Sequence, residues 1–260
     1  MGQTQDSPAP GEELNTGAAT TPRQAASVML LRDHDEQLEV LLVKRTPKAR
    51  FMGGVWVFPG GAVDAADAET PSDRATKAQN AEQAPGDSAT ETQSAQQIPS
   101  DGTTGAQSAE QAPGGGEGDR AHRIAALREL REEAGVTLAS PEELVEFSRW
   151  ITPAAITVRF DTRFFLARLP TGEEPVVDGE ECVDLGWFSP QAALAAHEQK
   201  QIELVFPTIK QLEHLRVFPT ATALLEHAAG AEVLPVEPRV FFDGEFARIL
   251  LPGEPGYEQA

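Results

Sequence analysis

The sequence has few of the residues that stabilise small folds through disulfides or bound metal ions. It also has few long apolar runs. Cysteine occurs once, at Cys182, so no disulfide can form within the chain. The five histidines lack the paired spacing of a zinc site. No apolar run approaches the roughly 20 residues needed to span a bilayer, and we expect no membrane segment. These absences exclude a disulfide scaffold and an integral membrane protein.

Basic residues are also scarce. The chain has 21 Lys and Arg against 41 Asp and Glu, a formal net charge of −20. A general nucleic-acid binder needs a positive surface to neutralise phosphates, so we expect no nucleic-acid partner. An anionic small-molecule substrate would need a local basic patch or a bound cation.

Two stretches are nearly without bulky apolar side chains. Residues 1–24 are rich in Gln, Thr, Ala, Gly and Pro, and within residues 68–120 the only aliphatic side chain larger than alanine is Ile98. The second stretch repeats itself, since residues 81–86 recur at 109–114. Such segments cannot bury enough apolar surface to offset their ordering entropy. We predict a disordered tail over 1–24, one domain over 25–252 with a disordered insertion at 68–120, and a second tail over 253–260.

The remaining residues alternate between strand and helix patterns. The helix predicted over 121–134 has an apolar face of Ile124, Leu127, Leu130 and Ala134 and ends at Gly135. Interleaved strands and helices indicate an α/β or α+β fold. Strands are predicted at 26–32, 38–44, 55–58, 160–169 and 183–188, further helices at 190–197, 208–217 and 220–229, and a closing hairpin at 239–242 and 246–251.

Residues 128–136, Arg-Glu-Leu-Arg-Glu-Glu-Ala-Gly-Val, carry the most informative pattern. On a helix, Glu129, Glu132 and Glu133 lie within about one turn of each other. Their mutual repulsion would be relieved by a divalent cation, and oxygen ligands suit Mg²⁺ or Mn²⁺. Arg128 is four residues before Glu132 and can orient it. The alternative for the glutamate pair alone is an ordinary solvated acidic face.

This string resembles the second half of the Nudix box, G-x5-E-x7-R-E-U-x-E-E-x-G-U, in which U is a bulky aliphatic residue. The first half is matched by Gly61 and by Asp67, which stands where the family has Glu. Sixty residues separate Asp67 from Arg128, where the family has seven, so the low-complexity insertion splits the box. The resemblance implies a Nudix-type α/β/α sandwich with a mixed central sheet.

A second string resembles the coenzyme-A-cleaving Nudix enzymes, which carry L-L-T-x-T-[SA]-x3-R-x3-G-x3-F-P-G-G before the box. Here the match runs through Leu41-Leu42, Arg50, Gly54 and Phe58-Pro59-Gly60-Gly61 with every x3 gap kept. Residues 150–153 and 159–165 also resemble that subgroup. The chain departs from the pattern at three positions, Val43, Arg45 and Thr46.

Four cations lie within seven residues just before the box: Lys44, Arg45, Lys48 and Arg50. In so acidic a chain they form a local basic patch suited to a phosphate-rich ligand. The alternative is a charged edge that blocks strand pairing. For a coenzyme A substrate, the cations expected to bind its phosphates are Arg45, Arg50, Arg159 and Arg163.

The resemblance implies hydrolysis of a diphosphate linkage by water with Mg²⁺ or Mn²⁺. It makes Glu132 and Glu133 direct metal ligands, Glu129 a ligand or the general base, and the carbonyl of Gly61 or its neighbour Gly60 a backbone ligand. It makes Arg128 a support for these carboxylates. A further acid is expected from Asp67, Glu180 or Glu181.

Three functions follow from the resemblance. The first is a diphosphatase that converts coenzyme A or acyl-CoA to 3′,5′-ADP and (acyl-)4′-phosphopantetheine. The second is a hydrolase of ADP-ribose or NADH-type dinucleotides, and the third is a non-catalytic nucleotide sensor. Some coenzyme-A relatives end in a peroxisomal address, whereas this sequence ends Tyr257-Glu-Gln-Ala260. We therefore expect a cytoplasmic protein.

Overall fold

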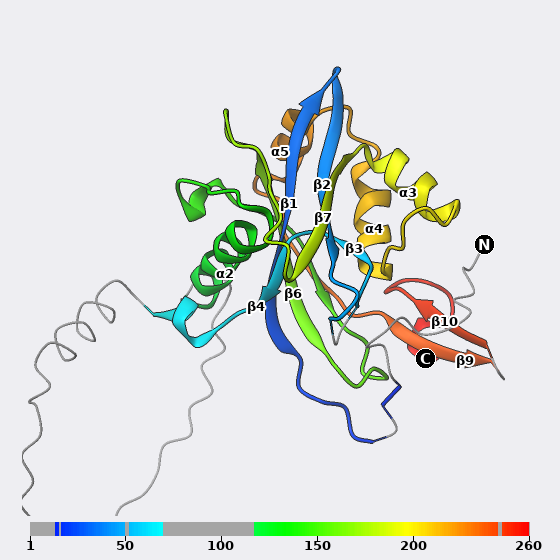
Figure 1. Ribbon diagram of the computed structural model, residues 1–260. Coiled ribbons are helices and arrows are strands. Elements are labelled where there is room, and N and C mark those ends of the chain that lie inside the picture. The colour runs from blue at the N-terminus through cyan, green and yellow to red at the C-terminus, as the bar shows by residue number, and fades with distance from the viewer. Residues whose placement is uncertain (1–13, 16, 50–51, 70–116, 244–245, 260) are drawn as a thin grey trace, which may run out of the picture.

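The computed structural model describes residues 14–15, 17–49, 52–69, 117–243 and 246–259, with a mixed sheet at the centre (Figure 1). The strand path is β3-β2-β1-β6-β5-β8, with β4 paired to β1 and β7 to β2. The pairs β1–β6 and β5–β8 are parallel, and the others are antiparallel. The strands are β1 (Arg23–His34), β2 (Gln37–Arg45), β3 (Trp56–Val57), β4 (Gly60–Ala62), β5 (Val145–Ile151), β6 (Phe160–Arg168), β7 (Cys182–Phe188) and β8 (Pro235–Val236).

Helices cover both faces of this sheet (Figure 1). Helix α2 (Glu117–Ala134) lies on one face, and α3 (Pro190–Glu198), α4 (Phe206–Leu215) and α5 (Ala221–Ala228) lie on the other. Residues 25–31 of β1 are all buried, as expected for a strand covered on both sides. These layers confirm the predicted α/β/α sandwich with a mixed central sheet.

The buried face of α2 differs from the predicted one. Ala125, Ala126, Leu130 and Ala134 have no exposed surface, whereas Ile124 and Leu127 are only half-buried. Small alanine side chains let the helix axis approach the sheet closely. The buried stripe is therefore rotated away from Ile124, and it also contains Glu129 and Glu133.

The other predicted elements are confirmed with small shifts of their ends, including a hairpin of β9 (Arg239–Asp243) and β10 (Phe246–Leu250) that forms a separate two-stranded sheet. Strands β4, β5 and β8 were not predicted. Glycine has low strand propensity, which hides β4, and β8 has only two residues. In the described ranges, no helix is long and apolar enough to cross a membrane.

The predicted segment boundaries need correction. Arg23 and Gln24 belong to β1 rather than to a tail, and residues 117–120 form the first turn of α2 rather than the end of the insertion. The 3-10 helix η3 (Tyr257–Gln259) lies in the predicted C-terminal tail, and Tyr257 donates a hydrogen bond to the carbonyl of Glu237 at 2.8 Å. Most of the predicted tail over 1–24 and of the insertion lies outside the described residues.

The two sides of the insertion meet in the structure. The 3-10 helix η1 (Ala65–Ala68) packs beside α2, and Arg120 Nη1 donates a hydrogen bond of 3.3 Å to the carbonyl of Glu69. Replacing residues 70–116 by a short Gly-Ser linker is therefore expected to shift the melting temperature by only a few degrees, because loop-closure entropy changes slowly with length. A thermal melt checks this. A loss of ten degrees or so would contradict the prediction.

Candidate active site

The last turns of α2 lie against the two glycines of β4. The Gly60 N–H donates a hydrogen bond of 2.8 Å to Glu133 Oε2. At Gly61, a β-carbon would lie 2.2 Å from Glu129 Oε1, so only glycine lets this carboxylate approach the strand backbone. Two helix carboxylates and the β4 backbone thus form one cluster.

Arg128 ties this cluster together. Its Nη1 donates to Glu129 Oε1 at 2.8 Å and to Glu132 Oε2 at 3.1 Å. Its Nε and Nη2 donate to the two Asp67 oxygens at 3.2 and 3.0 Å, and Nη2 also donates to the Ala62 carbonyl at 3.0 Å. Hydrogen bonding to Asp67 raises the pKa of Arg128 further above its usual range. The guanidinium therefore joins η1, β4 and the helix carboxylates, as expected of a supporting residue.

The three glutamates have different surroundings. Glu133 has 2% of its surface exposed and Glu129 8%, whereas the Glu132 side chain is 56% exposed. Burial raises the pKa of Glu133 to about 7, although Gly60 and Arg45 act in the opposite direction. Burial also raises the pKa of Glu129, partly offset by Arg128. Two of the three carboxylates are thus held where a negative charge costs free energy unless a cation compensates it.

The Glu133 carboxyl should make the metal-free protein pH-sensitive. Between its usual pKa of 4.5 and its folded-state pKa of about 7, the folded protein binds a proton that the unfolded chain has released. Stability should therefore fall as pH rises through this range, by an amount on the order of 3 kcal/mol. Denaturant unfolding in EDTA at several pH values measures this fall. Glu133→Gln should flatten it, and identical slopes for both proteins would refute the assignment.

The donor set fits a divalent cation. It consists of the carboxylates of Glu129, Glu132 and Glu133, and carboxylate oxygens are ligands that Mg²⁺ and Mn²⁺ prefer. The cradle at Gly61 and the buried Glu129 and Glu133 match a site that gains from positive charge. Within the described part of the chain, no three His, Cys, Asp or Glu side chains are gathered as a ready metal cage. Arg128 and Arg45 hold the carboxylates instead.

The further acids that the sequence suggested lie beside the cluster in different ways. Asp67 is buried, and it accepts hydrogen bonds from Arg128 and from the Asp64 N–H at 2.8 Å. Glu181 is exposed, and its charge raises the pKa of both Glu129 and Glu133. Glu180 is exposed in the same turn. Asp67 is therefore placed to position Arg128, and Glu181 is an exposed acid whose charge acts on the two buried glutamates.

Of the four arginines predicted to bind phosphate, the three that the structure describes, Arg45, Arg159 and Arg163, do not form one patch. Arg45 Nη1 lies 3.4 Å from Glu133 Oε1, and its Nε is buried without a hydrogen-bond partner. Arg163 Nη1 contacts Asp119 Oδ1 at 2.9 Å, and its Nε is also buried without a partner. Arg50 lies outside the described residues. Among the three described arginines, Arg45 is the one that contacts a box glutamate.

Arg159 is placed differently from the prediction. It is buried and donates to the carbonyls of Thr152 and Thr20, at 2.9 and 2.7 Å, and to Glu237 Oε1 at 2.6 Å. These contacts join three separate parts of the chain and occupy the guanidinium. Arg159 therefore acts as an internal clamp, and its expected role in substrate binding is not supported.

The surroundings of Glu133 could not be predicted from the sequence. Cys182 lies opposite Arg45 in the β2–β7 pairing, is buried, and its thiol interacts with Glu133. Burial raises the pKa of the Cys182 thiol, so it packs as a neutral group. The hint in the sequence was the Cys at the start of a strand directly after the acidic turn, but nothing local linked it to a glutamate in α2.

Comparison with known proteins identifies the family of the chain. The family model described as the NUDT19 Nudix domain matches residues 14–145, and that of the NUDIX domain matches residues 93–207. A crystal structure of a NUDIX hydrolase from Alicyclobacillus acidocaldarius is 26% identical with a TM-score of 0.56, over 80% of this chain and 96% of that one. The chain belongs to the Nudix hydrolase family.

The comparisons also include two curated relatives of one kind. Acyl-coenzyme A diphosphatase NUDT19 of Xenopus laevis is 25% identical over 237 residues, covering 71% of this chain and 61% of the relative. The Homo sapiens protein of the same name is 26% identical over 275 residues, covering 85% of this chain and 73% of the relative. The chain thus spans less than two thirds of the length of the Xenopus relative.

Proposed function

We propose that this Nudix hydrolase cleaves the diphosphate of coenzyme A or its thioesters, giving 3′,5′-ADP and (acyl-)4′-phosphopantetheine. The observation that carries the proposal is the joining of the split box: Arg128 brings Asp67 of the first half together with Glu129 and Glu132 of the second. The coenzyme-A-type string that ends at Gly60 and Gly61 supports the substrate. The two curated relatives carry that activity in their names.

In the proposed reaction, water adds to one phosphorus of the anhydride and the bridging P–O bond breaks. Glu132 and Glu133 would hold the Mg²⁺ or Mn²⁺, with Glu129 as a third ligand or as the base that takes the proton from water. The cation would draw electron density from the phosphoryl oxygens and offset the carboxylate charges. Arg128 keeps Glu129 and Glu132 on the same side of α2.

The basic groups at the site are expected to neutralise the negative charge of the substrate phosphates. Arg45 is placed best, since it already neutralises Glu133 and belongs to the basic patch before the box. A cation bound by Glu133 would free the Arg45 guanidinium for a substrate oxygen, which it can contact through two parallel hydrogen bonds. Arg50 and Arg163 remain candidates for the 3′-phosphate.

The test is turnover of coenzyme A by the full chain with millimolar Mg²⁺, and mass spectrometry of the products. We expect 4′-phosphopantetheine and 3′,5′-ADP, and neither in EDTA. ADP-ribose, NADH and diadenosine polyphosphates are assayed in parallel. If one of these compounds is turned over faster and coenzyme A stays unchanged, the proposed substrate is wrong and the proposed reaction class is kept.

A further inference from the structure

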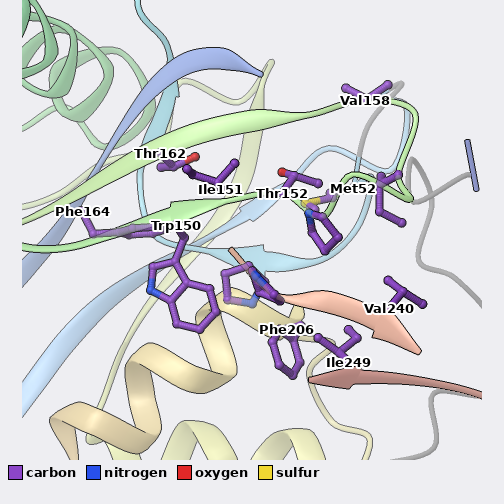
Figure 2. A pocket seen from close by; sticks show the side chains of 14 residues that line it. Met52, Trp150, Ile151, Thr152, Val158, Thr162, Phe164, Phe206, Val240 and Ile249 are labelled. Carbon is purple, nitrogen blue, oxygen red and sulfur yellow. The ribbon is translucent and has the colours of Figure 1, made fainter. Parts of the chain in front are cut away.

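An apolar cavity of about 100 Å³ lies between the sheet, α4 and the β9–β10 hairpin (Figure 2). The residues that line it, among them Trp150, Phe164 and Phe206, include no charged side chain. This cavity therefore offers no charged ligand to a cation and no counter-charge to a phosphate. The acidic groups that the proposed reaction leaves without a role lie elsewhere, in residues 176–182, the acidic segment that leads into β7.

The acidic segment connects the end of α2 to the end of β2. The Val176 N–H donates a hydrogen bond of 2.9 Å to the carbonyl of Ala134, which follows Glu133 and is the last residue of α2. The Thr46 N–H, just beyond β2, donates one of 2.8 Å to the carbonyl of Glu181. Both ends of the segment are thus fixed to elements that carry the candidate active site.

Asp178 folds the segment between these two ends. Its Oδ2 accepts hydrogen bonds from the N–H groups of Glu180 at 3.2 Å and Glu181 at 2.7 Å, and its Oδ1 accepts one from the Cys182 N–H at 2.9 Å. Although partial burial acts to raise the pKa of Asp178, these donors hold it below its usual range. The bonds are therefore made to an ionised carboxylate, which strengthens them. One side chain thus fixes three consecutive backbone N–H groups.

The shape of this turn places an acid beside the cluster. Cys182 is buried and its thiol interacts with Glu133, so the adjoining backbone is held close to that glutamate. Glu181 directly precedes Cys182, and its charge acts on both Glu129 and Glu133. The Glu181 side chain is exposed, so its position depends on the backbone of the turn rather than on packing around it.

We propose that Asp178 is a positioning residue of the cation site, whose carboxylate holds the turn that keeps Glu181 beside the two buried glutamates. The inference rests on the proposed function, because it assumes that these glutamates bind a divalent cation. A further carboxylate beside the cation adds negative charge and raises the affinity for it. Asp178 acts through Glu181 and does not itself contact the cation.

The experiment measures Mn²⁺ binding to the full chain by electron paramagnetic resonance of the free ion, without substrate. It compares wild type with Asp178→Ala, Glu181→Gln and the double variant. One carboxylate acting on a divalent cation through largely aqueous surroundings is worth about fivefold in Kd, so each single variant should weaken binding by about that factor. Because Asp178 acts through Glu181, the double variant should bind no more weakly than Glu181→Gln alone.

Asp184→Asn is the matched control. Asp184 is exposed on β7 and accepts the N–H of its neighbour Leu185 at 2.9 Å, so this variant removes an acidic charge near the turn and leaves the turn intact. It should bind Mn²⁺ as wild type does. Asp178→Asn keeps one acceptor oxygen and should lie between wild type and Asp178→Ala. Thermal melts establish that each variant folds, and if Asp178→Ala does not, the Asn variant with and without Glu181→Gln gives the same comparison.

The outcomes separate this proposal from the proposed function. Equal Mn²⁺ binding by wild type and the Asp178 variants overturns the positioning role and leaves the proposed function intact. Multiplication of the two single effects in the double variant also overturns it, because Asp178 would then act through its own charge. Absence of Mn²⁺ binding by wild type overturns the positioning role together with the proposed cation site. A different substrate would leave the test unaffected, since no substrate is present.

Discussion

Glu132→Gln is expected to lower kcat by at least a hundredfold while leaving the fold unchanged. Glu132 is the most exposed of the three box glutamates. Its hydrogen-bonded ion pair with Arg128 is partly exposed to solvent. Losing such a pair costs about 1 kcal/mol or less. Losing one metal ligand or proton acceptor at a reacting phosphate costs a factor of roughly 10² to 10⁴. Steady-state turnover and a thermal melt of the same sample measure the two effects separately.

The matched control is Glu226→Gln, which removes the same charge from an exposed position on α5, across the sheet from α2. It should change neither turnover nor stability. A Glu132→Gln enzyme that keeps wild-type turnover would show that the box does not perform the chemistry. Full loss of turnover together with unfolding would show that Glu132 supports the fold.

Gly61→Ala should also reduce kcat by about a hundredfold, with a small change in melting temperature. The new β-carbon would lie 2.2 Å from Glu129 Oε1 and 2.5 Å from its carboxyl carbon. This group is the end of a flexible side chain, so it would swing aside and leave the backbone in place. A displacement of about 1 Å at a reacting centre can cost a factor of 10². Turnover measured across a range of Mg²⁺ concentrations should also show weaker binding of the metal, because the Glu129 carboxylate is displaced.

Two neighbouring glycine variants make this test specific. In Gly60→Ala, the β-carbon would lie 2.6 Å from the carbonyl oxygen of Ala26 and 2.7 Å from the Ser27 α-carbon, so this variant should lose stability. Gly118→Ala has open space around the new carbon and should behave as wild type. If Gly61→Ala loses as much stability as Gly60→Ala, then contact with the backbone, and not with Glu129, is what requires glycine at position 61.

The Arg128 contacts explain how a box interrupted by a long insertion can still be assembled. Asp67 and Arg128 are 61 residues apart in sequence and joined by two hydrogen bonds. Residues 64–67 form a capped turn that presents the Asp67 carboxylate, with both the Asp64 and Arg128 donors directed at it. The two described segments that flank the insertion are therefore joined at this contact.

Much of the fold could be predicted because most of its helices and strands have a recognisable local sequence pattern. The alternation or continuous apolar character of residues 26–32, 38–44 and 160–169 predicted β1, β2 and β6. Strand β5 was missed because Val-Glu-Phe-Ser-Arg-Trp-Ile alternates between apolar and polar residues only over its first four positions. This strand is half-buried along its whole length, so its sequence carries a weaker hydrophobic signal than the central strands do.

The sequence by itself determined the family, through the residue types and spacing of the Nudix box, the three glutamates within one helical turn and the glycine pair before them. Helix and strand periodicity are local, so neighbouring residues suffice to establish them. Only the tertiary structure decided that Glu129 and Glu133 are buried and Glu132 exposed, that Asp67 pairs with Arg128, and that Arg159 is an internal clamp. Those outcomes depend on which face of α2 packs on the sheet and on contacts between residues far apart in the chain, and sequence periodicity contains neither.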